Sequence, residues 1–262
     1  MKKQYLVPGE MHFETARGKL AKHEKVHLFG YNPAVSTTSA KVISYSGSYK
    51  TPWPVNATTL RVTSTSENDT ANGTGARAVI LRGMAADGSR IEEEVATNGL
   101  TAAISQNAFW RLTEAFVSKS GTYATETAGS HAGTITISDG TNTWGIINQL
   151  ATFPSSTTSI GAYTVPLGYD CILESISLHA DNNKPMSVLL FKRENTSFTA
   201  PYDPMILLER WNGIAGSSTQ PFKGGLYLPP LTDVGFLAKS TSQEGSISVD
   251  AELTLIWRGD GI

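Results

Sequence analysis

The sequence predicts an all-β protein with two β-sandwich or jelly-roll-like domains that follow an extended N-terminal arm. Short segments that alternate apolar and polar residues recur from about residue 40 onward, and this alternation is the period of a half-buried strand. Turn-forming Asp-Gly pairs and clusters of Gly, Asn, Ser and Thr separate these segments. Charged residues make up only 17% of the chain, so hydroxyl and amide groups supply most of its polarity.

Residues 1–35 differ from the rest of the chain and are predicted to form the arm. They contain the main cluster of basic residues and show no clear strand alternation. An extended segment spans about 3.3 Å per residue, and arms of this kind often become ordered only against a neighbouring subunit. We therefore expect partner contacts from the basic and aromatic residues near the end of the arm: Lys19, Lys22, Lys25, Phe29 and Tyr31.

Residues 36–157 are predicted to form the first β domain. Strand-like segments flank Asp87-Gly88 and Asp139-Gly140, and an Asp-Gly pair in this setting is a strong hairpin signal because both central positions favour positive φ. The apolar stretch "AFWRLTEAFVSKSG" fits a strand or a short helix by periodicity alone. Its neighbours favour a strand.

Residues 158–262 are predicted to form the second β domain. The segment "ATFPSSTTSIG" before it has the composition of a linker, and five or more strand-like segments follow at the spacing of an antiparallel sandwich. The single cysteine, Cys171, has no partner for an internal disulfide. It lies in the apolar stretch "GYDCILESISL" and is predicted to be a small buried side chain.

Charge and hydropathy exclude several classes of partner. The net charge is −2, whereas a protein that binds nucleic acid usually has a basic excess, so we expect no nucleic acid partner. No segment approaches the roughly 20 apolar residues of a membrane-spanning helix, so no membrane contact is expected. No apolar run follows Lys2 and Lys3, so we expect no signal peptide and synthesis in a cytoplasm.

Few motifs suggest chemistry, and we predict no catalytic residue, cofactor or metal. The stretch from His23 to His27 matches H-E-x-x-H, but a zinc protease needs this motif on a stable helix together with a third ligand. Gly18 and Gly30 leave room for only a short helix, so a metalloprotease is a remote alternative. Four aspartates in predicted turns would bind calcium only if several loops converged: Asp69, Asp87, Asp139 and Asp181.

Tryptophan side chains offer a second kind of binding surface, because exposed aromatic rings can stack on sugars. The chain has five tryptophans, and most of them are expected in the core or at an interface. Trp53 and Trp144 lie beside turn residues and are the two that we expect near a surface. They are therefore the candidates for glycan contact.

Several stretches resemble virion structural proteins of marine tailed bacteriophages. The resemblance begins with "KVHLFGYNPAVSTT" and continues in order through "DTANGTGARAVILRGMAADGSRIEEEVATNG", "AFWRLTEAFVSKSG", "HAGTITISDG" and "IGAYTVPLGY". It covers most of the chain from about Lys25 onward, and it departs from the family pattern at "FPSSTTSI". The shared motifs are structural, so no active site is carried over.

The resemblance implies a non-enzymatic virion protein that is present in many copies and made in the cytoplasm of a host bacterium. The leading hypothesis is a capsid decoration or cement protein, expected as a homotrimer, with the arm and one domain holding the major capsid protein or another virion protein. The alternative is a tail- or fibre-associated adaptor or receptor-binding protein with glycan contact.

Overall fold

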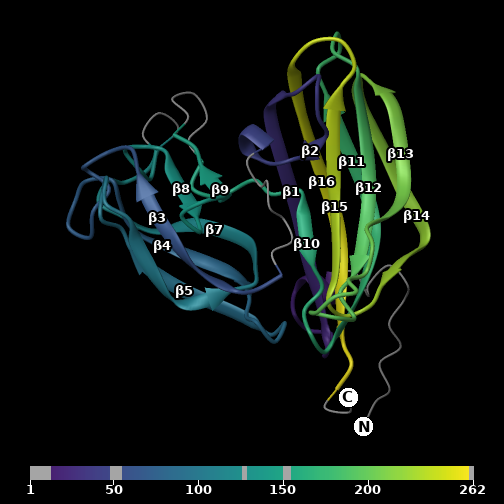
Figure 1. Ribbon diagram of the computed structural model, residues 1–262, viewed down its shortest axis with the longest axis horizontal. Helices are drawn as coiled ribbons and strands as arrows, with labels where there is room; N and C mark the ends of the chain where they lie inside the picture. Colours follow the sequence, from purple (N-terminus) through teal and green to yellow (C-terminus); the bar gives the residue numbers. More distant parts are fainter. Residues whose placement is uncertain (1–12, 48–54, 126–128, 150–154, 260–262) are drawn as a thin grey trace.

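The computed structural model describes residues 13–47, 55–125, 129–149 and 155–259, and within them the chain forms four antiparallel sheets (Figure 1). This confirms the predicted all-β class. The helical segments in these ranges are a turn at residues 13–16 and the 3-10 helix η1 (Tyr45–Gly47). None of the described helices is long and apolar enough to cross a membrane.

Two sheets pack face to face around one hydrophobic core, and we call this unit the main sandwich. The first sheet has the strand order β1(His23–Val35), β16(Gly245–Trp257), β11(Tyr169–Ala180) and β14(Gly216–Leu228). The second has the order β10(Ala162–Thr164), β15(Thr232–Ser240), β12(Met186–Glu194) and β13(Ile206–Ile214), and β2(Lys41–Val42) also pairs with β15. Alternate residues of these strands point into the core, as the sequence pattern predicts.

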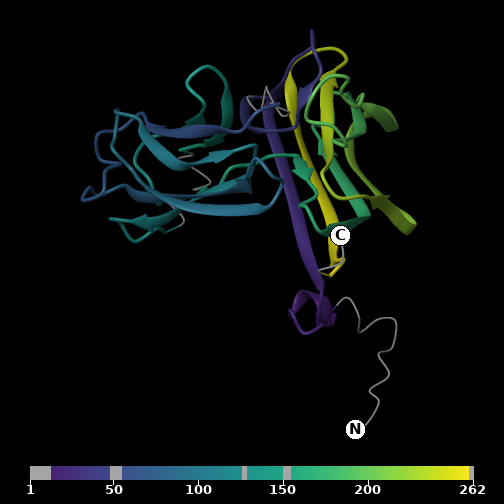
Figure 2. The same ribbon diagram turned by 60° about the horizontal axis from the view of Figure 1, so that its bottom comes forward.

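The other two sheets form a smaller unit, which we call the inserted unit because its strands lie between β2 and β10 in sequence. One sheet has the order β6(Ala103–Phe109), β3(Thr58–Ser64), β8(Ile135–Ser138) and β9(Thr143–Ile147). The other has the order β5(Arg90–Ala96), β4(Ala76–Met84) and β7(Arg111–Ser120). The inserted unit lies against one edge of the main sandwich, beside β1 and β10 (Figures 1 and 2).

The segment from His23 to Val35 is extended, as predicted for the arm, but it lies inside the main sandwich. It forms β1, which pairs with β16 from His23 opposite Ile256 to Val35 opposite Gly245. Strand β2 also pairs with a strand of the C-terminal half. The strand pairing therefore does not follow a division at residue 35. Strand β1, near the start of the chain, pairs with β16, near its end.

Local turn signals predicted the hairpins well. Asp87-Gly88 joins β4 to β5 and Asp139-Gly140 joins β8 to β9, with positive φ at both glycines. Neither aspartate has a positive φ, so the turns use only the glycine in the left-handed region, as longer hairpin loops do. Cys171 is fully buried in β11, as predicted, and burial raises the pKa of its thiol to about 12.

A buried ion pair joins the inserted unit to the main sandwich. The guanidinium of Arg111, at the start of β7, donates from Nε to Oδ1 of Asp233 at 3.0 Å and from Nη2 to Oδ2 at 2.9 Å. The exposed fractions of the two side chains are 2% and 0%. Thr164 and Asn195 donate to the same carboxylate at 2.6 and 2.9 Å. A carboxylate with this many donors is well compensated for its loss of water.

Replacing Arg111 should therefore destabilise the protein strongly. Arg111→Ala leaves the buried carboxylate of Asp233 without its cation, and we expect the free energy of unfolding to fall by about 3–5 kcal/mol. Urea unfolding followed by circular dichroism measures this change. The matched control is Arg82→Ala, because Arg82 is 48% exposed and pairs with two exposed glutamates; its effect should stay within about 1 kcal/mol. Equal effects of the two changes would contradict the structural role of the buried pair.

Candidate functional site

The structure brings three of the predicted contact residues onto one surface. Lys25, Phe29 and Tyr31 occupy alternate positions of β1, so their side chains share the outward face of the first sheet. Phe29 is 43% exposed. Lys25 is tied to its own sheet, because its Nζ donates to the Glu174 carboxylate at 2.5 Å. Burial, with the nearby charge of Asp181, raises the pKa of Tyr31. A partner contact by these residues remains a prediction.

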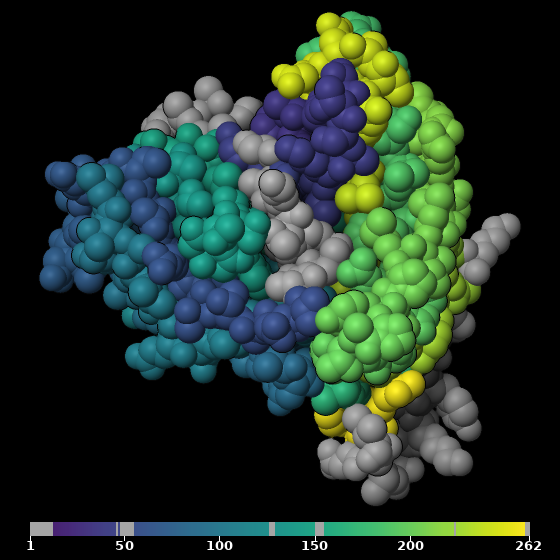
Figure 3. Space-filling view, in the orientation of Figure 1, coloured from purple at the N-terminus to yellow at the C-terminus, as the bar shows by residue number. Residues whose placement is uncertain are grey.

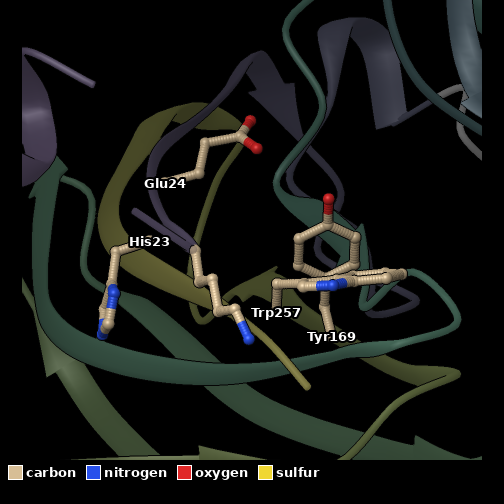
Figure 4. A pocket seen from close by; sticks show the side chains of 5 residues that line it. His23, Glu24, Tyr169 and Trp257 are labelled. Carbon is tan, nitrogen blue, oxygen red and sulfur yellow. The ribbon is translucent and has the colours of Figure 1, made fainter. Parts of the chain in front are cut away.

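Lys19 and Lys22 lie apart from that face, in the turn before β1, and both are exposed. Lys22 lines a cavity of about 400 Å3 together with His23, Glu24, Tyr169 and Trp257. The Tyr169 and Trp257 rings meet edge to face in this cavity, with centroids 4.9 Å apart (Figure 4). The guanidinium of Arg90 lies over the Tyr169 ring, 4.5 Å from its centre, so one face of this ring is covered.

The geometry overturns the metalloprotease alternative. The H-E-x-x-H residues lie on a strand, where His23 and Glu24 point in different directions (Figure 4) and residues four apart are separated by about 13 Å. Each also has its own partner: His23 contacts the carbonyl of Ala21, Glu24 accepts from Arg90, and His27 pairs with Asp250. They form no common metal site.

One mixed cluster has the donor types that a divalent cation binds. His27, Asp250 and Glu252 project from the neighbouring strands β1 and β16, and a ligand atom from each lies within 4.8 Å of the others. Imidazole and carboxylate groups suit zinc or manganese. The cluster lies on the outer surface of the sheet, where groups of this kind are common without an ion. We do not assign it a metal.

The two tryptophans predicted for glycan contact do not form such a surface in the described structure. Trp53 lies outside the described residues. Trp144 is 1% exposed, so the prediction for it is wrong. The physical reason is the Asp139 turn: the Trp144 Nε1–H donates to the Asp139 carboxylate at 3.0 Å, and this bond allows the indole to be buried beside the turn.

Asp69 illustrates how the predicted aspartate turns are used. Its carboxylate accepts bonds from the backbone N–H groups of Ala76, Ala132 and Gly133, at 2.7, 2.8 and 2.8 Å, and from the Ser64 hydroxyl at 2.5 Å. Asp69 is fully buried. Several loops do converge on it, but backbone donors occupy the oxygens that calcium would need.

A cavity that the sequence did not indicate lies where the two units meet, and we call it the Trp110 cavity. Its volume is about 180 Å3. The inserted unit supplies Trp110 and Arg111, and the segment that follows β12 supplies much of the other wall. Figure 3 shows this green segment directly beside the blue surface of the inserted unit. The lining residues are Val55, Trp110, Arg111, Arg193, Asn195, Ser197, Phe198, Tyr202 and Asp203.

Aromatic and charged groups alternate around the Trp110 cavity. The Phe198 ring meets Trp110 edge to face, with centroids 5.1 Å apart, and the Arg111 guanidinium lies 3.8 Å from the centre of the Trp110 ring. Hydrogen bonds from Thr196 lower the pKa of Asp203, and the charge of Arg193 adds to this effect. The cavity therefore has an ionised carboxylate and a guanidinium between aromatic walls.

Comparisons with known proteins add little to this picture. No protein-family model and no curated protein matches the chain. Among solved structures, T=1 particles derived from infectious bursal virus align over 91% of this chain and 71% of theirs, with 13% identity and a TM-score of 0.28. A subviral particle of infectious bursal disease virus aligns over 92% of this chain and 74% of its own, with 11% identity and a TM-score of 0.27. Values this low carry no conclusion about function.

The Asp139 turn generates a pH prediction. Burial alone would raise the pKa of Asp139, but bonds from the Asn142 and Thr141 backbone and from Trp144 lower it from 3.8 to about 2. The folded pKa lies below the unfolded one, so the carboxylate stabilises the fold above pH 4, and this contribution is lost as the pH falls from about 4 to 2. Because the turn is partly solvated, we expect about 1 kcal/mol.

Asp139→Asn tests this prediction, because it keeps the shape of the side chain and removes its charge. The variant should lose about 1 kcal/mol at pH 7 and should show a weaker decline in stability between pH 4 and pH 2. Urea unfolding at a series of pH values measures both effects. An unchanged pH dependence in the variant would show that other groups control acid unfolding.

Proposed function

We propose that this chain is a non-enzymatic structural protein of a tailed-bacteriophage virion, which decorates or cements the capsid through contacts between its own copies. The sequence resemblance suggests this role. The structural observation that carries it is an uncovered apolar strand edge on the main sandwich.

Strand β13 forms this edge. The strand orders leave β13 and β14 at one side of the main sandwich, while β1 and β10 at the other side lie beside the inserted unit. Met205, which precedes β13, is 47% exposed. Ile206 and Leu207, the first two residues of the strand, are 45% and 54% exposed, and we call these three residues the β13 patch. Successive strand residues point to opposite faces, so the start of the strand is uncovered on both, whereas Leu208, Trp211 and Ile214 further along it pack against the core.

An exposed apolar edge strand is a template for pairing with another chain, and proteins usually protect such edges. The inserted unit covers the opposite side of the sandwich, but among the described strands none pairs with the outer edge of β13. A protein present in many copies would bury this edge against a neighbour. We therefore propose that a second copy of the chain covers the β13 patch, with a homotrimer as the expected assembly and the major capsid protein as the further partner.

Locating the protein on intact particles tests the proposed role. We expect electron cryomicroscopy of the virion to show this fold repeated over the icosahedral shell. Removal of the protein from particles should then lower their resistance to heat or low salt. Density confined to the tail, or stripped particles of unchanged stability, would contradict capsid decoration.

A charge in the β13 patch should separate the copies. Leu207→Glu places a carboxylate in the proposed interface, and we expect the mass measured by light scattering to fall from that of an oligomer to that of a monomer. The matched control is Ile104→Glu, because Ile104 is 55% exposed but lies on the inserted unit. A monomeric parent protein, or dissociation by the control alone, would contradict an interface at β13.

The second candidate is a tail- or fibre-associated adaptor or receptor-binding protein that contacts glycans. The Trp110 cavity favours it, because aromatic walls and paired polar groups around a small cavity suit a sugar ring. The residues differ from those predicted from the sequence, since Trp144 is buried.

A further inference from the structure

We propose that the Trp110 cavity is a binding site for a neutral saccharide ring. This proposal gives the second candidate function its ligand class, but it concerns the isolated chain and does not depend on where the protein lies in a particle.

The first observation is that two residues lining this cavity have buried N–H donors without a hydrogen-bond partner. Among the described residues, Trp110 Nε1 and Arg193 Nε are both shielded from solvent and have no hydrogen-bond partner. Trp110 is 2% exposed, and both residues line the cavity. A buried donor without an acceptor costs about 1–3 kcal/mol. Both residues line one cavity, so a ligand with acceptor oxygens that reaches these donors would satisfy them.

The opposite charges of Arg193 and Asp203 favour a ligand whose acceptor oxygens are neutral. Asp203 faces the same cavity as Arg193, and its pKa is lowered, so it is ionised at neutral pH. A ligand carboxylate would be attracted by Arg193 and repelled by Asp203. A sugar hydroxyl accepts from Trp110 or Arg193 through its lone pairs and donates its proton to Asp203. The neutral hydroxyl group therefore matches both polar walls.

The aromatic rings and the volume of the cavity favour a ligand with a single sugar ring. Phe198 and Tyr202 line the cavity and are 40% and 54% exposed, so their rings are accessible to the apolar C–H side of a sugar. A volume of about 180 Å3 is below the range of pockets for drug-sized ligands and suits a single ring. The Trp110 Nε1–H is shielded from solvent, and Phe198 packs against the indole, so a side chain of the cavity wall must turn aside for a sugar to reach this N–H.

Isothermal titration of the full chain with the methyl glycosides of glucose, galactose and N-acetylglucosamine tests the proposal. We expect at least one of these to bind. Glycerol, which has hydroxyls but no ring, and glucuronic acid, which adds a carboxylate, should bind more weakly. Failure of all three glycosides to bind, or tighter binding of glucuronic acid, would overturn the proposal. Tighter binding of glucuronic acid would instead identify an acidic ligand.

Two variants remove the proposed donors. Trp110→Phe keeps an aromatic ring and deletes the N–H, and Arg193→Gln deletes the charged donor; each should weaken glycoside binding about ten-fold. Trp257→Phe and Arg210→Gln are the matched controls outside the cavity and should leave the affinity unchanged. Thermal unfolding checks that the variants fold.

Discussion

The contact between Arg111 and Asp233 fixes how the two β units sit together. Apolar surfaces can pack in several orientations at similar cost, whereas a bidentate guanidinium–carboxylate pair has one geometry. Here the pair is fully buried, and its carboxylate also accepts from Thr164 and Asn195. These bonds connect β7, β10, β15 and the segment after β12 at a single point. The Trp110 cavity lies beside this point, because Arg111 and Asn195 also line it.

The strands and hairpins could be predicted because their signals are local. Alternation, Asp-Gly pairs and apolar runs act over a few residues, and they located most strands of both units. Strand β1 was missed because its core-facing positions include Gly30 and Asn32, which interrupt the apolar period. Its partner β16 lies at the other end of the chain. No local pattern can show that the first strand completes a sheet with the last one.

The candidate site was hidden for a related reason. Trp110 lies in an apolar run that is indistinguishable from core, and Arg193 lies at the charged end of the strand-like segment that forms β12, where arginines are common. Only the tertiary fold brings them together at the contact between the units. Trp144 was predicted to lie near the surface because it follows a turn, but it is buried. The sequence contains Asp139, but it does not show that this carboxylate turns inward to accept from the indole.

Two of the stretches on which the proposed resemblance to virion proteins rests meet where three backbone segments cross. Gly30 lies in the first of them and Gly161 in the last, and a Cβ added to Gly30 would lie 2.4 Å from the Ile43 carbonyl oxygen and 2.5 Å from Gly161 Cα. The Gly161 N–H donates to that same carbonyl at 2.7 Å. Three backbone segments therefore cross where no side chain fits, which requires glycine at both positions. Arg111 lies in another of these stretches. Residues that position backbones and units set the architecture of a protein, so a resemblance that rests on them concerns how the chain is built. Arg193, Phe198 and Tyr202 lie outside these stretches and Trp110 lies within one, so the proposed binding site joins one residue of these stretches to three residues outside them.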